Sequence, residues 1–231
     1  MYEQRGRGTE RGWLLTAWQR PAEEAGGDFI VTKEVGHTLR VFVGDIAGHG
    51  NSAARAVELI RPMIERDLGG TINEATLRRW SKAVGELLPD RFVAMTCIQV
   101  DRDTGRATIL NAGNPQAIIL RRDRDSIEYV RSNGMPLGLV DEDEWRAPSS
   151  QTFTLAAGDE LICFTDGLPD TLGVRDRGRF GVDRIVSALS DHAEHSPVQS
   201  LRHSVCAFAD DSTDQDDVTV LWIGGATRWA A

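Results

Sequence analysis

Long apolar runs and paired cysteines are both absent from this sequence of 231 residues. No apolar stretch approaches the ~18 residues that a membrane-spanning helix needs, and the opening residues, MYEQRGRGTE, are too polar for an export signal. The three cysteines, Cys97, Cys163 and Cys206, form an odd set in apolar surroundings, which is typical of reduced, buried thiols. We therefore expect a cytoplasmic protein with no membrane anchor and no disulfide framework.

Positive charge is scarce as well. The chain has 26 Lys and Arg against 35 Asp and Glu, which gives a formal net charge of -9 at pH 7. Such an excess of negative charge repels a phosphate backbone unless a local basic patch outweighs it. Nucleic acid is therefore not an expected partner.

Tracts rich in proline or glycine are also missing, because the 8 prolines and 23 glycines are spread along the chain. With 41% hydrophobic and 26% charged residues, the composition is that of a folded globular protein. The length suits one domain of ordinary size. We expect a flexible N-terminus over residues 1–12, a single domain over 13–224 and a C-terminal tail over 225–231.

Hydrophobic patterning groups the predicted strands and helices in separate blocks instead of alternating them, which is typical of an α+β fold with mainly antiparallel sheets and helices outside. Arg91–Val130 looks like a four-strand meander, Pro62 predicts a kink or break in the first helix, and Thr71 with Glu74 forms a capping box for the second. The expected strands are Trp13–Gln19, Asp28–Glu34, Thr38–Asp45, Arg91–Val100, Arg106–Ala112, Gln116–Leu120, Ser126–Val130, Gln151–Leu155, Glu160–Thr165 and Val218–Ile223. The expected helices are Asn51–Leu68, a second one up to Leu88, Val182–Ser190 and Pro197–Ala209, and Arg131–Ser150 is read as a long loop.

The first hairpin places two carboxylates opposite each other. Gly36-His37 suits a two-residue turn, and if Val35 faces Thr38, every antiparallel pair has residue numbers that sum to 73. Asp28 and Asp45 obey this rule, so their Cβ atoms should lie ~5 Å apart on one face of the sheet. Like charges so placed repel each other, which indicates that a cation lies between them.

Two further carboxylates, Asp166 and Asp216, stand at the ends of apolar strands. Glycines flank these acids, as in Gly26-Gly27-Asp28 and Asp166-Gly167, and allow close backbone approach. Clustered carboxylates need a metal to balance their charge, and an all-oxygen ligand set favours Mg²⁺ or Mn²⁺.

Three other readings of the chemistry-bearing residues are open. His192 and His195 have the spacing of a zinc ligand pair but lack accompanying cysteines. His49, in the glycine-rich loop beside Asp45, has either a structural role or one in assisting phosphate or water. Gly48, Gly50 and Ala53 match a GxGxxA dinucleotide pattern, but a second helix is expected where that fold requires a parallel strand.

The sequence resembles a known family, the metal-dependent protein serine/threonine phosphatases (PPM family), in the bacterial branch typified by SpoIIE, RsbU and RsbX. The resemblance runs in family order over roughly residues 13–224. The matching stretches are PAEEAGGDF, VFVGDIAGHGNSAA, FVAMTCIQVD, LNAGNPQAIIL, GMPLGL, GDELICFTDGL, RFGVDRI and DDVTVLWI.

This resemblance implies a sandwich of two mainly antiparallel sheets flanked by helix pairs, with two Mn²⁺ or Mg²⁺ ions at one end. By motif, Asp45 would bridge the metals, the Ile46 carbonyl would bind one of them, and Asp166 and Asp216 would hold the other. Asp28 would act directly or through a water. A hydroxide bridging the metals would attack phosphorus in line.

The partners that the resemblance implies are a phosphorylated protein, such as a STAS-type anti-sigma-factor antagonist, and an activating protein that acts through the helices of residues 51–88. The arginine with which eukaryotic relatives hold phosphate has no clear counterpart, since Arg20 lies eight residues before Asp28. A catalytically silent phosphoprotein-binding module of the same fold is the alternative reading.

Overall fold

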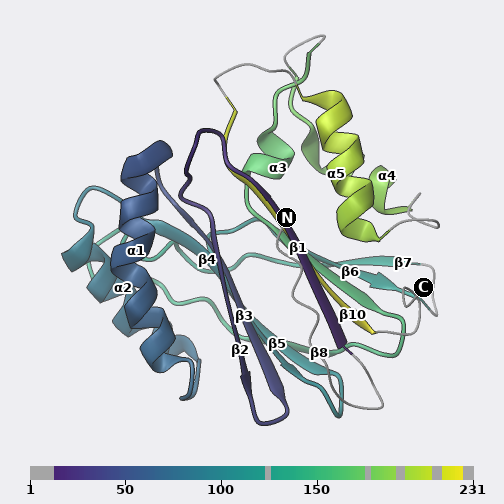
Figure 1. Cartoon of the computed structure of the whole chain (residues 1–231). Helices are drawn as coiled ribbons and strands as arrows, with labels where there is room; N and C mark the ends of the chain where they lie inside the picture. Colours follow the sequence, from purple (N-terminus) through teal and green to yellow (C-terminus); the bar gives the residue numbers. More distant parts are fainter. Residues whose placement is uncertain (1–12, 123–125, 175–177, 191–195, 210–214, 226–231) are drawn as a thin grey trace.

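The computed structural model describes residues 13–122, 126–174, 178–190, 196–209 and 215–225. Within them, two five-stranded antiparallel sheets pack face to face, and helices cover both outer faces (Figure 1). The expected helix-flanked sandwich is confirmed. None of the described helices is long and apolar enough to cross a membrane.

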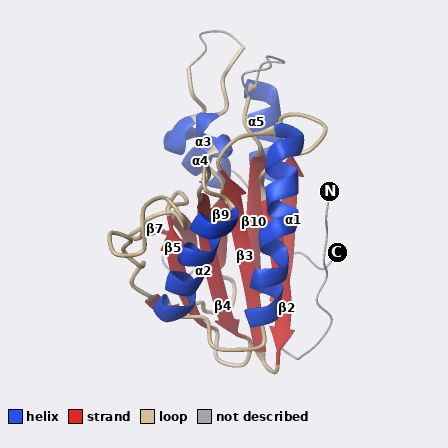
Figure 2. Ribbon diagram, turned by 90° about the vertical axis from the view of Figure 1, so that its left-hand side faces the viewer, coloured by secondary structure: helices blue, strands red, loops and turns tan. Residues whose placement is uncertain are grey.

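The first sheet has the strand order β2-β3-β4-β5-β8 and lies beneath α1 and α2, which cross its outer face in Figure 2. Its strands are β2 (Phe29–Val35), β3 (Thr38–Ile46), β4 (Val93–Asp101), β5 (Arg106–Ala112) and β8 (Gln151–Thr154). The covering helices are α1 (Gly50–Asp67) and α2 (Glu74–Leu87).

The second sheet has the order β1-β10-β9-β6-β7 and carries α3, α4 and α5 on its side of the sandwich. Its strands are β1 (Trp13–Arg20), β6 (Ala117–Arg121), β7 (Ser126–Val130), β9 (Glu160–Phe164) and β10 (Val218–Gly225). The helices are α3 (Gly167–Asp170), α4 (Gly181–Ser190) and α5 (Pro197–Phe208). The short helix α3 was not predicted from the sequence.

Strand periodicity divides the core into three apolar layers. In β3, Val41 and Val43 point between the two sheets, whereas Phe42 and Ile46 pack under α1 and α2. A third layer fills the space between the second sheet and α4 and α5, around Trp222. Side chains that continue the inter-sheet rows past the ends of the strands therefore meet at one open end of the sandwich.

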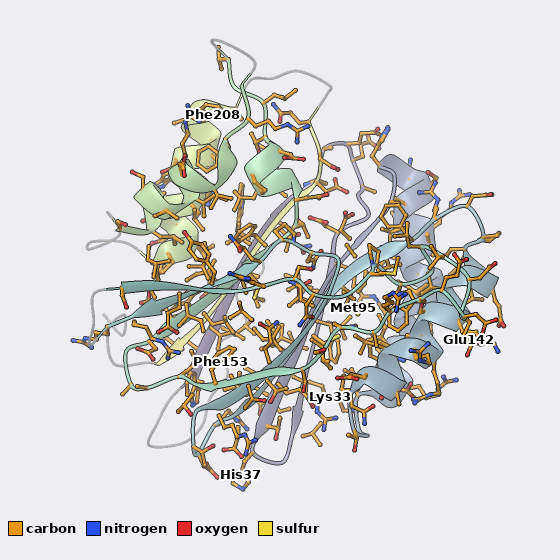
Figure 3. The ribbon with its side chains drawn as sticks, turned by 180° about the vertical axis from the view of Figure 1, so that it is seen from behind. Lys33, His37, Met95, Glu142, Phe153 and Phe208 are labelled. Carbon is orange, nitrogen blue, oxygen red and sulfur yellow. The ribbon has the colours of Figure 1, made fainter. Side chains whose placement is uncertain are left out.

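That end lies opposite the β2–β3 turn. The turn carries His37, which Figure 3 shows at one extreme of the molecule, far from Phe208 of α5. The predicted hairpin register is confirmed, since Val35 pairs with Thr38 and Phe29 with Gly44.

Several sequence-based expectations about the elements are wrong. β4 and β5 pair in the first sheet whereas β6 and β7 belong to the second, so these strands do not form one meander. Of the kink or break expected at Pro62, the break is absent, since helix α1 runs through this residue. The cap of α2 is Asn73, whose side chain accepts a hydrogen bond from the Thr76 N–H, and not Thr71.

The long segment between β7 and β8 is an ordered cover for α2. Its Trp145 is buried, and the indole donates to the carbonyls of Met135 and Pro136. The Gly138 N–H donates to Ser81 of α2. None of its residues lines the acidic cavity described next.

Candidate metal centre

The open end of the sandwich contains a cavity of about 480 Å³ with acidic walls. Three of the predicted site residues, Asp45, Asp166 and Asp216, line it together although they come from segments far apart in the sequence. The complete lining is Ala22, Glu23, Asp45, Ala47, Gly48, His49, Phe92, Asp166, Gln215 and Asp216.

The geometry of Asp28 and Asp45 follows from the hairpin register. Beyond the last ladder pair, the Ile46 N–H still donates to the Gly27 carbonyl at 3.3 Å, and these residue numbers also sum to 73. Asp28 and Asp45 therefore lie opposite each other, on the face that Ile30 and Val43 turn toward the other sheet. Neither Asp28 nor Ile46 lines the cavity itself.

Two threonines hold Asp28: Thr165, directly after β9, and Thr219, in β10. The Thr165 hydroxyl donates to Asp28 Oδ2 at 2.8 Å and accepts the Thr219 N–H at 2.9 Å. The Thr219 hydroxyl also hydrogen-bonds Asp28 and accepts from the Gln19 amide. The other oxygen, Asp28 Oδ1, is buried without a hydrogen-bond partner, so the structure leaves one carboxylate oxygen available to a ligand.

Burial and mutual repulsion raise the pKa of all four carboxylates. For Asp45, burial is the largest cause, followed by the charges of Asp166 and Asp216, and its pKa rises from 3.8 to about 7. Burial and the charge of Asp45 raise the pKa of Asp28 well above its ordinary value. Asp166 and Asp216 shift in the same direction, again chiefly through burial.

These carboxylates fit divalent metal ions. No ion pair among the described residues joins any of the four to a basic side chain. Within the described part of the chain, no three acidic, histidine or cysteine side chains group closely enough to hold one ion. Mg²⁺ matches such a site, because it is usually bound by one or two carboxylates and completes its shell with water and other oxygens.

The adjacent acids Asp216 and Asp217 take opposite roles. Asp216 is exposed to the cavity, whereas Asp217 is only 2% exposed and accepts the N–H groups of Ala22 and Gly27. Close packing around Asp217 accounts for two flanking glycines: a Cβ at Gly26 would collide with its carboxylate, and one at Gly167 with its carbonyl oxygen.

His49 lies on the cavity wall, where its Nδ1 pairs with Glu23 Oε1 at 2.6 Å. The glycine pattern around it is not a dinucleotide site, since α1 leads into α2 and every pairing between named strands is antiparallel. The zinc candidates His192 and His195 lie outside the described residues.

The sequence-based search for functional residues missed the residues that support or line the site without being acidic strand ends. Among them are Thr165, Thr219 and Phe92. Strand periodicity offered a signal for the threonines, because both stand at inter-sheet positions close in sequence to a predicted ligand, Thr165 next to Asp166 and Thr219 three residues after Asp216.

Comparison with known proteins decides the family. The family model described as Stage II sporulation protein E (SpoIIE) matches residues 35–224. The chain belongs to the SpoIIE family. The resemblance drawn from the motifs is thus confirmed, and this SpoIIE-family chain is a PP2C phosphatase domain by fold and family.

Solved structures share the fold. The RsbU and RsbW domains of Rv1364c from Mycobacterium tuberculosis match with a TM-score of 0.75 and 24% identity, over 93% of this chain and 60% of that one. The SiaA-PP2C domain of Pseudomonas aeruginosa matches with a TM-score of 0.76 and 23% identity, over 91% and 84%. RsbX in complex with magnesium matches with a TM-score of 0.67 and 19% identity, over 95% and 98%. The SpoIIE-family chain therefore spans about three fifths of the first of these chains.

Proposed function

We propose that this chain is a Mn²⁺- or Mg²⁺-dependent phosphatase that hydrolyses phosphoserine and phosphothreonine on a regulatory protein. The observation that carries the proposal is the meeting of Asp45, Asp166 and Asp216 at one cavity. Burying several carboxylates together costs free energy unless cations neutralise them. A catalytic metal centre would supply those cations and so account for the cluster. Membership of the SpoIIE family supports the same conclusion.

In this proposal Asp45 and the Ile46 carbonyl would hold one ion, and Asp45, Asp166 and Asp216 the other, with Asp28 opposite Asp45. Because no three of the described carboxylates group closely enough to hold one ion, Asp45, Asp166 and Asp216 would move closer together when the second ion binds. Two such ions, when bound, lower the pKa of a water and neutralise the charge of the phosphoryl group. The chain fixes the carboxylates at strand ends. Burial and the charge of Asp45 raise the pKa of Asp28, and the hydrogen bonds of the two threonines oppose this rise only in part.

A protein substrate suits the position of the cavity. It opens at the end of the sandwich, and no second domain among the described residues encloses it. The proposed substrate is a STAS-type anti-sigma-factor antagonist, which the likeness to an RsbU domain supports. An activating protein would act on α1 and α2, because α1 begins at Gly50 directly after the cavity-lining residues Ala47, Gly48 and His49.

The test is phosphate release from phosphorylated STAS proteins of the same organism, followed by intact mass with Mn²⁺ and with chelator. We expect hydrolysis that stops on chelation and is lost in Asp166→Asn. The matched control is Asp143→Asn, an exposed acid of the β7–β8 segment that does not line the cavity, and it should keep wild-type turnover.

The outcomes separate substrate, chemistry and the silent-module alternative. If an unrelated phosphopeptide is hydrolysed equally fast, the STAS assignment is wrong while the phosphatase activity stands. Binding of the phosphoprotein without turnover at saturating Mn²⁺ would instead identify a binding module, and full activity in chelator would contradict the metal mechanism.

A further inference from the structure

The hydrogen bonding beside Asp45 departs from a regular antiparallel ladder at one residue pair. In such a ladder, two hydrogen-bonded residues exchange both N–H···O bonds. Gly27 and Ile46 make only one of them: the Ile46 N–H donates to the Gly27 carbonyl, but the Gly27 N–H turns away to Asp217 Oδ2 at 2.6 Å. Outside the regular helix and strand ladders, no other described N–H donates to the Ile46 carbonyl, and Val93, which faces Ile46 from β4, donates its N–H to the Leu137 carbonyl instead.

Asp217 is built into this position. Its Oδ1 accepts the Ala22 N–H at 2.7 Å. Its two oxygens therefore bind the segment between β1 and β2 at two points, Ala22 and Gly27. The side chain is 2% exposed and stands at an inter-sheet position of the chain leading into β10. Gly27 keeps the space beside the carbonyl open, since a Cβ there would lie 2.7 Å from the Ile46 oxygen.

We propose that Asp217 is a positioning residue that captures the Gly27 N–H and thereby keeps the Ile46 carbonyl free to bind a metal ion. This inference rests on the proposed metal-dependent function. Without the carboxylate, the Gly27 N–H would pair with the Ile46 carbonyl and close the ladder, because a buried carbonyl takes the nearest donor. Asp217 would thus act through the backbone and not as a ligand.

Wild-type protein gives the first test. Scalar couplings across hydrogen bonds, measured by NMR on deuterated, metal-free protein, should connect the Gly27 nitrogen to the Asp217 carboxyl carbon and not to the Ile46 carbonyl carbon. Addition of Mg²⁺ should then shift the Ile46 carbonyl resonance. A coupling from Gly27 to Ile46 in the wild type would overturn the inference without any variant being made.

Two variants give the second test, by Mg²⁺ titration in a calorimeter. Asp217→Asn removes one acceptor, and Gly26→Ala displaces the carboxylate sterically while its charge stays. Loss of a supporting partner typically weakens metal affinity 10- to 100-fold, so we expect at least ~10-fold weaker Mg²⁺ binding in both and a new Gly27–Ile46 coupling. The control is Gly85→Ala on α2, whose Cβ would meet nothing within 4 Å.

If folded Gly26→Ala binds Mg²⁺ with wild-type affinity, the inference is contradicted. Any weaker binding in Asp217→Asn would then come from the lost charge and not from the displaced carboxylate. Should either variant fail to fold, the wild-type couplings still decide. Failure of the proposed function is distinguishable: a chain that binds Mg²⁺ with these couplings but releases no phosphate contradicts that function alone. Conversely, an active phosphatase in which Gly27 couples to Ile46 contradicts this inference alone.

Discussion

The Asp45 carboxylate favours metal binding but destabilises the metal-free fold. Its pKa of about 7 arises from burial and from the neighbouring acids, so the ionised carboxylate is unfavourable when no cation is bound. We predict that Asp45→Asn abolishes Mg²⁺ binding but raises the free energy of unfolding of the metal-free protein at pH 8. Calorimetric titration and chemical denaturation measure the two effects, and a variant less stable than metal-free wild type would show a structural role for this carboxylate.

Thr165 links the two sheets through Asp28. Its hydroxyl donates to Asp28 Oδ2 and accepts the Thr219 N–H, so Thr165→Val leaves two buried polar groups without this partner. We predict a loss of ~1–3 kcal/mol in the free energy of unfolding together with weaker Mg²⁺ binding. Thr152→Val, at an exposed position of β8, is the control and should change stability by no more than ~0.5 kcal/mol.

Single residues could be predicted from the sequence where local geometry was enough. The sum rule of the hairpin placed Asp28 opposite Asp45 because one two-residue turn fixes that whole register. The partners of Asp28 were missed because Thr165 directly follows β9 and Thr219 lies in β10, both strands of the other sheet. Which strands face each other across a sandwich is not encoded in any short window of sequence.

At the scale of elements, the sequence predicted helix α2 correctly but assigned its N-terminal cap to the wrong residue. Asn73 caps it and accepts from the Thr76 N–H. We predict that Asn73→Ala costs ~1 kcal/mol of stability. Thr71→Ala should be nearly neutral, because the Thr71 side chain makes no hydrogen bond within the described residues and only its carbonyl accepts from the Thr76 hydroxyl. Thermal denaturation of both variants measures this, and the reverse order of losses would restore the Thr71 capping box.

The connection between β5 and β6 is the element that the sequence reading placed wrongly. Strands joined by a short loop usually pair, but here residues 113–116 carry the chain from one sheet to the other. Asn114 anchors this crossing, since its side-chain amide donates to the Val43 carbonyl and the Thr96 hydroxyl. A polar residue that ties a short loop to buried strands cannot be told from an ordinary turn residue by sequence alone.

At the scale of the whole molecule, the sandwich collects charge at one end that neither sheet holds alone. Asp28 directly precedes β2 and Asp45 lies in β3 of the first sheet, whereas Asp166 follows β9 and Asp216 precedes β10 of the second. All four have a raised pKa, with burial as the largest cause. The stability of the metal-free fold must therefore depend on pH in a direction that these shifts determine.

An acid whose pKa is higher in the folded than in the unfolded state binds more protons when folded, so stability falls as pH rises between the two values. For Asp45 this window runs from 3.8 to about 7, and at ~1.4 kcal/mol per pKa unit the loss is at most ~4.5 kcal/mol. We predict that urea denaturation in chelator gives a lower free energy of unfolding at pH 8 than at pH 5. Asp45→Asn should reduce this slope, and saturating Mg²⁺ should abolish or reverse it, because bound cations stabilise the ionised carboxylates and only the folded state holds the site together. Metal-free protein that becomes more stable from pH 5 to pH 8 would show that the four carboxylates do not repel one another at this end of the sandwich.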